Sequence, residues 1–175
     1  SRLESLLLPM GVKNAIPRIK DSYIDMTSFW LTSARRACLA DQVAALLHPA
    51  TRMESFTIGL LQDMAIPVLI DMGQHDYDKV LRRWHDDKDV NLPEIERSKD
   101  GYDHQSLGAL MAVEWNLPEY LVEAIMSHHS SQKESKTQPA ERLVSNLRYK
   151  EMGDEPLERF TSGMLYEQLE LAADK

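Results

Sequence analysis

Apolar residues recur along most of the chain at intervals of three and four positions, which is the period of one face of an α-helix. We find no run of alternating β-branched residues bounded by turn signals. Helices are predicted over residues 3–7, 12–19, 29–47, 51–66, 67–70, 77–84, 93–99, 103–115, 118–129, 139–152 and 162–172. We therefore expect an all-α fold, a single globular multi-helix bundle over residues 1–175.

Capping residues mark several of the predicted helix ends. Thr27 or Ser28 is expected to be the N-cap of the helix at 29–47. Pro67 and Pro118 are expected at helix starts, where the missing N–H of proline leaves no helical hydrogen bond unmade. Gly101 is expected to end the helix at 93–99. These signals divide the chain into short helices joined by brief turns.

The charge of the chain narrows the choice of partners. The 175 residues include 28 acidic and 20 basic ones, for a formal net charge of -8. Such a molecule repels phosphate backbones and anionic lipid headgroups, so neither nucleic acid nor a membrane is an expected partner. The pairs Arg35–Arg36 and Arg82–Arg83 are expected to lie on solvated helix faces.

The single cysteine indicates the compartment. Cys38 has no second cysteine with which to pair, and its neighbours are small and apolar. It is expected to be core filler in a protein of a reducing compartment. No secretory leader and no apolar run near the length of a membrane span are visible, so a cytoplasmic location is expected.

Titratable residues interrupt the apolar stripes of three predicted helices. Asp63 follows Phe56 by seven positions, and His104 precedes Leu107 by three. His128 and His129 follow Ile125 by three and four, so at least one of these imidazoles points inward. Buried charges need a partner or a bound cation. Asp63, His104, His128 and His129 are therefore candidate ligands of a divalent metal, while an Asp63–His104 hydrogen bond without metal stays an open alternative.

The order of motifs between residues 29 and 130 resembles that of the HDOD domain, a relative of the HD and HD-GYP phosphohydrolases. The motifs are Phe29–Trp30 with Ser33, Gly59–Leu60–Leu61–Gln62–Asp63, Gly101–Tyr102–Asp103–His104 with Gly108, Trp115–Asn116–Leu117–Pro118, and His128–His129. Residues 139–175 fit the family more loosely. The resemblance implies an HD-like helical fold and further helices before residue 1, so that the chain is expected to be N-terminally truncated.

The resemblance also implies an incomplete metal centre. Thr32 stands where the catalytic relatives have their first histidine, and Gln62 replaces the histidine of the His–Asp pair. No aspartate occurs at 146–148, where the last family carboxylate is expected. A two-metal hydrolytic centre is therefore not expected, and at most one divalent ion, of iron, manganese, zinc, nickel or magnesium, is expected to bind weakly.

Three functions follow from the resemblance. The leading expectation is a noncatalytic bacterial signal-transduction or output module, which binds other signalling proteins or an upstream regulatory domain. In this case no residue is catalytic and no cofactor is required. The alternatives are a reduced metal-dependent phosphohydrolase acting on a nucleotide or phosphodiester, and a sensor that binds a small nucleotide in the vestigial pocket.

Overall fold

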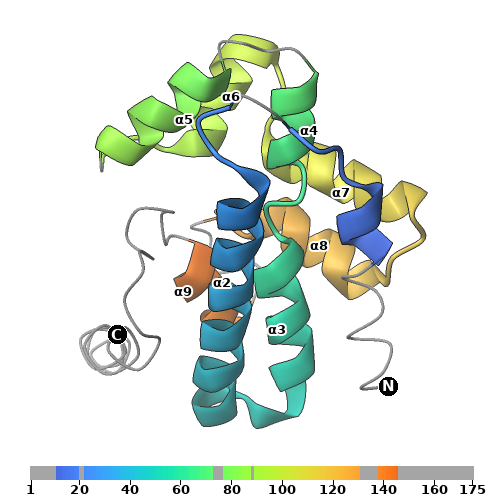
Figure 1. Cartoon of the computed structure of the whole chain (residues 1–175). Coiled ribbons are helices and arrows are strands. Elements are labelled where there is room, and N and C mark those ends of the chain that lie inside the picture. The colour runs from blue at the N-terminus through green and yellow to red at the C-terminus, as the bar shows by residue number, and fades with distance from the viewer. Residues whose placement is uncertain (1–10, 20–21, 73–76, 88, 131–137, 146–175) are drawn as a thin grey trace.

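The structure is a computed structural model that describes residues 11–19, 22–72, 77–87, 89–130 and 138–145 (Figure 1). Every regular element within these ranges is helical, which confirms the all-α prediction. The helices are α2 Met26–Leu47, the short 3-10 turn η1 Pro49–Thr51, α3 Arg52–Leu61, α4 Ile66–Asp71, α5 Tyr77–Asp86, α6 Leu92–Asp100, α7 His104–Glu114, α8 Glu119–Ser127 and α9 Pro139–Ser145. The helices predicted at 3–7 and 162–172 lie outside the described residues.

The two long central helices form the frame of the fold. α2 and α3 lie side by side, α9 packs against both, and α8 packs against α3 (Figure 1). α7 pairs with α8, while α5 and α6 extend from the end of the frame where α2 begins (Figure 1). A Cβ atom on Gly59 would lie 3.1 Å from the Arg36 carbonyl oxygen, so glycine permits the close approach of α3 to α2.

Apolar packing holds this frame to the outer helices. One buried cluster joins α2, α4, α5 and α6, and consists of Ile24, Phe29, Ile66, Leu69, Tyr77, Val80, Leu81, Trp84 and Leu92. A second cluster joins residues 11–19 to α7 and α8, and consists of Val12, Ile16, Leu61, Met64, Ala112 and Ile125. The two clusters flank residues 62–65, so this turn is fixed from both sides.

The predicted N-cap of α2 was wrong. Asp25 holds this position, and its carboxylate accepts hydrogen bonds from the backbone N–H groups of Thr27 and Ser28 at 2.8 and 3.0 Å. The helix therefore begins three residues earlier than residue 29, at Met26. Thr27 and Ser28 are the donors of the first turn, which an aspartate satisfies as well as a hydroxyl would. Gly101 does end α6, in the left-handed conformation with φ of 79°.

The segment Pro49–Asp71 has the length and apolar composition of a membrane-spanning helix. Of its most apolar window, 67% is buried inside the fold, as is usual for the core helix of a globular protein. The turn at 62–65 also divides the segment into α3 and α4. The segment accordingly gives only weak evidence for a membrane span.

Candidate metal centre

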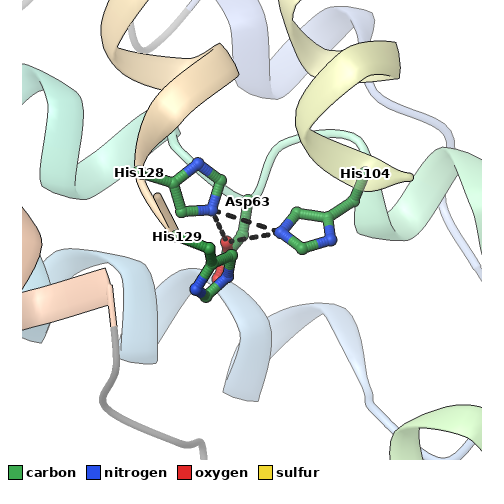
Figure 2. A group of neighbouring side chains, drawn as sticks. All are labelled: Asp63, His104, His128 and His129. Atoms are coloured by element: carbon green, nitrogen blue, oxygen red, sulfur yellow. Dashed lines mark hydrogen bonds and ion pairs between the residues drawn. The ribbon is translucent and has the colours of Figure 1, made fainter. Parts of the chain in front are cut away.

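The four candidate ligands converge at one point, although their sequence positions span 63 to 129 (Figure 2). One ligand atom from each of Asp63, His104, His128 and His129 lies within 4.8 Å of the others. His104 and His128 occupy helix ends, Asp63 lies in the turn after α3, and His129 directly follows His128. His104 is the first residue of α7, and His128 is the C-cap of α8.

The periodicity predicted that Asp63 lies on the apolar stripe of a helix, and this prediction was wrong. Asp63 lies in the turn between α3 and α4. Gln62 is the C-cap of α3, and helical hydrogen bonding resumes only at Ile66. The inward direction of the Asp63 side chain was nevertheless correct, since Asp63 is 3% exposed. The turn is enclosed by buried neighbours on both sides, which keeps Asp63 in the interior of the fold.

The imidazoles of His104 and His128 present the same nitrogen to the Asp63 carboxylate. Nε2 of His128 lies 3.2 Å from Asp63 Oδ1, and Nε2 of His104 lies 3.7 Å from the same oxygen (Figure 2). The two Nε2 atoms are 3.2 Å apart. Both rings are fully buried, whereas His129 is half-buried and stacks beside them. Three donor atoms from distant helices thus face one small volume.

The opposite ring nitrogens are fixed by the protein. His128 Nδ1 lies 2.7 Å from the Ile125 carbonyl oxygen, to which it donates, so in the neutral ring Nε2 keeps its lone pair. His104 Nδ1 lies 2.7 Å from Glu96 Oε2, and the same carboxylate oxygen accepts the His104 backbone N–H at 3.0 Å. The Tyr77 hydroxyl donates to the other Glu96 oxygen. Such outer contacts orient histidine ligands in metal sites.

A buried arginine lies on the other side of Asp63. Arg36 is 1% exposed, and its guanidinium forms an ion pair with Asp63 Oδ2. The expectation that Arg35–Arg36 lies on a solvated face is therefore wrong for Arg36, while Arg35 is half-buried. Arg36 follows Phe29 by seven positions and Ser33 by three, which places it on the packed face of α2. The carboxylate provides the partner that makes burial of the guanidinium tolerable.

The charges in this cluster follow from its burial and contacts. Burial alone would raise the pKa of Asp63, but Arg36, and after it His128 and His104, hold this pKa well below its usual range. Burial also opposes protonation of His104, yet the Glu96 carboxylate outweighs it and raises the pKa of His104. Burial lowers the pKa of His128, and lowers that of His129 well below its usual value. A proton on His104 can therefore bridge to His128 without any metal.

Sequence reasoning missed three residues of this cluster: Arg36, Glu96 and Tyr77. The signal for Arg36 was its spacing from Phe29 and Ser33, which outweighs the general preference of arginine for solvent. Glu96 follows Leu92 by four positions and faces inward with it on α6. No local pattern marks Tyr77 as a hydrogen-bond donor to Glu96, because this contact joins two helices.

The donor set fits one metal ion and not two. Ligand atoms that share a zinc-like ion at about 2.0–2.2 Å lie roughly 3–3.5 Å from one another, close to the separations among His104, His128 and Asp63. Asp63 is the one carboxylate in the group, and its second oxygen is occupied by Arg36. Thr32 and Gln62 are both buried, and neither side chain offers an imidazole or a carboxylate. Both Gln62 amide atoms lack a hydrogen-bond partner within the described residues.

Comparison with known families gives a clear match. The HDOD domain family matches residues 1–131, about three-quarters of the chain, so the chain belongs to this family. The match begins well before residue 29, where the motifs first become recognisable in the sequence. No curated protein matches the chain.

Solved structures support the same fold. A Shewanella amazonensis SB2B protein provisionally described as a phosphohydrolase has a TM-score of 0.70 at 18% identity, over 91% of this chain and 61% of its own. An HDOD domain protein of unknown function from Geobacter sulfurreducens has a TM-score of 0.62 at 16% identity, over 85% and 49%. The MmoQ response regulator of Methylococcus capsulatus str. Bath has a TM-score of 0.52 at 21% identity, over 73% and 49%.

At these identities the similarity defines the fold alone. The chain spans between 49% and 61% of the length of the three proteins. It is thus similar to one part of each of them.

Proposed function

We propose that this chain is a noncatalytic signal-transduction module that acts through protein–protein contact in the cytoplasm and carries a degenerate HD-type metal site. The observation that carries the proposal is the ion pair between Arg36 and Asp63. The one carboxylate available to a metal is already neutralised by a buried guanidinium. A hydrolytic centre needs a firmly held ion that lowers the pKa of a bound water, and this cluster is poorly equipped to hold one.

The residues that would hold a single ion are Asp63, His104, His128 and His129. A bound divalent ion would supply Lewis acidity toward a phosphoryl oxygen or a water. The protein's own contribution is otherwise structural: Glu96 and the Ile125 carbonyl orient the imidazoles, and Arg36 balances the carboxylate. The cluster joins α2, α3, α6, α7 and α8 and so ties the helices of the domain together.

Two further observations support a binding role. One of the structural relatives is a response regulator, a protein of signal transduction. On the outer face of α7, Leu110 and Val113 are both 58% exposed and one helical turn apart. We propose this pair as part of the surface that contacts the partner. The net charge of -8 supports a partner other than nucleic acid, such as another signalling protein or an upstream regulatory domain.

The proposal is tested by a turnover assay. Purified protein is incubated with cyclic and linear dinucleotides, nucleoside monophosphates and a chromogenic phosphodiester, each with manganese, iron(II) or magnesium. We expect the same rate for the chain and for its Asp63→Ala variant, at the level of the buffer. Metal-dependent hydrolysis that Asp63→Ala abolishes would refute the noncatalytic function.

The converging ligands favour one alternative, a reduced metal-dependent phosphohydrolase. This function requires an ion that stays bound through purification. Elemental analysis of protein purified without chelator distinguishes the two: about one transition metal per chain would support the hydrolase, and only trace metal would exclude it.

A further inference from the structure

The position of Arg36 suggests a role beyond packing. Arg36 lies in the middle of α2, and its buried guanidinium contacts Asp63 Oδ2, while Asp63 Oδ1 faces the imidazoles of His104 and His128. The two oxygens of one carboxylate therefore face two different environments. One side is a fixed protein cation, and the other is a cluster of nitrogen ligands.

This arrangement sets the electrostatics of the ligand cluster. A cation bound at Oδ1 would share the carboxylate charge with a guanidinium that cannot lose its proton. In a buried site the repulsion between the two positive charges is weakly screened. Arg36 also keeps the pKa of Asp63 low, so the carboxylate is charged, with Oδ2 paired to the guanidinium and Oδ1 facing the two imidazole nitrogens.

We propose that Arg36 is the residue that sets the metal affinity of this cluster, by acting as a built-in substitute for the cation that Asp63 would otherwise bind. The ligands Asp63, His104, His128 and His129 are sufficient for one divalent transition metal, and the guanidinium keeps them metal-free. Removing its charge converts the cluster into a one-ion site. The inference deepens the proposed function, because it names what makes the site degenerate.

The experiment compares metal binding by Arg36→Met and by the unaltered chain. Zinc affinity is measured at neutral pH by competition with a chromogenic chelator, and stoichiometry by elemental analysis. We expect Arg36→Met to bind one zinc per chain at least about tenfold more tightly than the unaltered chain, which corresponds to about 1.4 kcal/mol. The double variant Arg36→Met/Asp63→Asn should lose this gain, because the carboxylate ligand is removed.

Arg83→Met is the matched control. Arg83 is exposed on α5, so its loss changes the net charge by the same amount without touching the cluster. Zinc affinity of this variant should equal that of the unaltered chain. If Arg36→Met binds no more tightly than Arg83→Met, the inference is wrong.

Loss of Arg36 leaves a buried carboxylate uncompensated, and folding of Arg36→Met is therefore also measured with and without metal. Recovery of the helical circular dichroism signal on addition of zinc, and not of magnesium, would itself support the inference. Should Arg36→Met stay unfolded with zinc, the neutral polar variant Arg36→Gln decides: a gain in zinc affinity is expected, and no gain would overturn the inference. Metal-dependent hydrolysis by the unaltered chain would refute the proposed function, whereas equal zinc affinities without any hydrolysis would refute this inference and leave the proposed function standing.

Discussion

The buried carboxylates of the described residues are Asp63, Glu96, Asp103 and Glu141, and two of them, Asp63 and Glu141, face different charges. Asp63 lies between Arg36 and two imidazoles, and its pKa is held well below the usual range. Glu141 of α9 is equally hidden from solvent, and accepts hydrogen bonds from Ser55 Oγ at 3.1 Å and from the Gln138 N–H at 2.9 Å. Burial, reinforced by the nearby Glu54, raises the pKa of Glu141.

The comparison shows that neutral hydrogen bonds do not replace a cation. Both carboxylates lose hydration and both accept hydrogen bonds, but Asp63 pairs with a buried guanidinium, whereas the attraction of the nearby Arg142 does not outweigh burial for Glu141. The ionised form of Asp63 is therefore an integral part of the fold, whereas the ionised form of Glu141 opposes the docking of α9. The ionised form of a buried acid stabilises the fold when it faces a cation and destabilises the fold when burial is not compensated in this way.

The largest loss of unfolding free energy is expected when only one partner of the Arg36–Asp63 ion pair is removed. Arg36→Met should lose about 3–5 kcal/mol of unfolding free energy, because it leaves an uncompensated buried charge. The measurement is urea unfolding in the presence of chelator. The double variant Arg36→Met/Asp63→Asn should lose less than the sum of the two single variants, with a coupling of about 1–3 kcal/mol. Simple additivity would mean that the pair contributes nothing beyond packing.

A smaller loss of unfolding free energy is expected when α3 is forced away from α2. A Cβ atom at Gly59 would lie 3.1 Å from backbone atoms of Arg36 and Ala37, which cannot move aside as a flexible side chain could. Gly59→Ala should therefore lose about 1–3 kcal/mol of stability. Gly11→Ala is the control, since nothing lies within 4 Å of the added atom. Equal unfolding midpoints for the two variants would contradict the close approach.

The smallest change in stability is expected from substitution of Glu141. Because its folded pKa is raised, its contribution to stability is present in acid and is lost as pH rises through that pKa. Glu141→Gln should therefore raise the melting temperature at pH 7, by a free energy of no more than about 1 kcal/mol, since one acceptor is lost as well. The gain should disappear near pH 4. A gain that grows on acidification would contradict the raised pKa.

The helices and their order were predictable because each is encoded locally, by apolar periodicity and by proline and glycine at its ends. The start of α2 was misjudged because Asp25, Thr27 and Ser28 are all good N-caps, and only the backbone decides which one accepts. Asp63 was assigned to a helix because seven residues separate it from Phe56. The same spacing remains when the last residues unwind into a turn, so periodicity alone cannot tell the two apart.

The candidate ligands were predictable one by one, but their partners were not. Inward spacing identified Asp63, His104 and His128, and the structure brings these residues together with His129. Arg36 was overlooked because its adjacent arginine suggested a surface pair, although its position on α2 indicated burial. Contacts between separate helices, such as Arg36 with Asp63, depend on packing that no local pattern records.

The buried guanidinium of Arg36 also constrains how this domain can change by mutation. Histidines introduced at positions 32 and 62 while Arg36 remains would add imidazoles beside an existing positive charge, with little gain in ion binding. Loss of Arg36 before those histidines are present would leave the buried Asp63 carboxylate without a cation to balance its charge. Neither order of steps passes through an intermediate that is both stable and better at binding metal, so building a two-metal centre here would require several simultaneous changes.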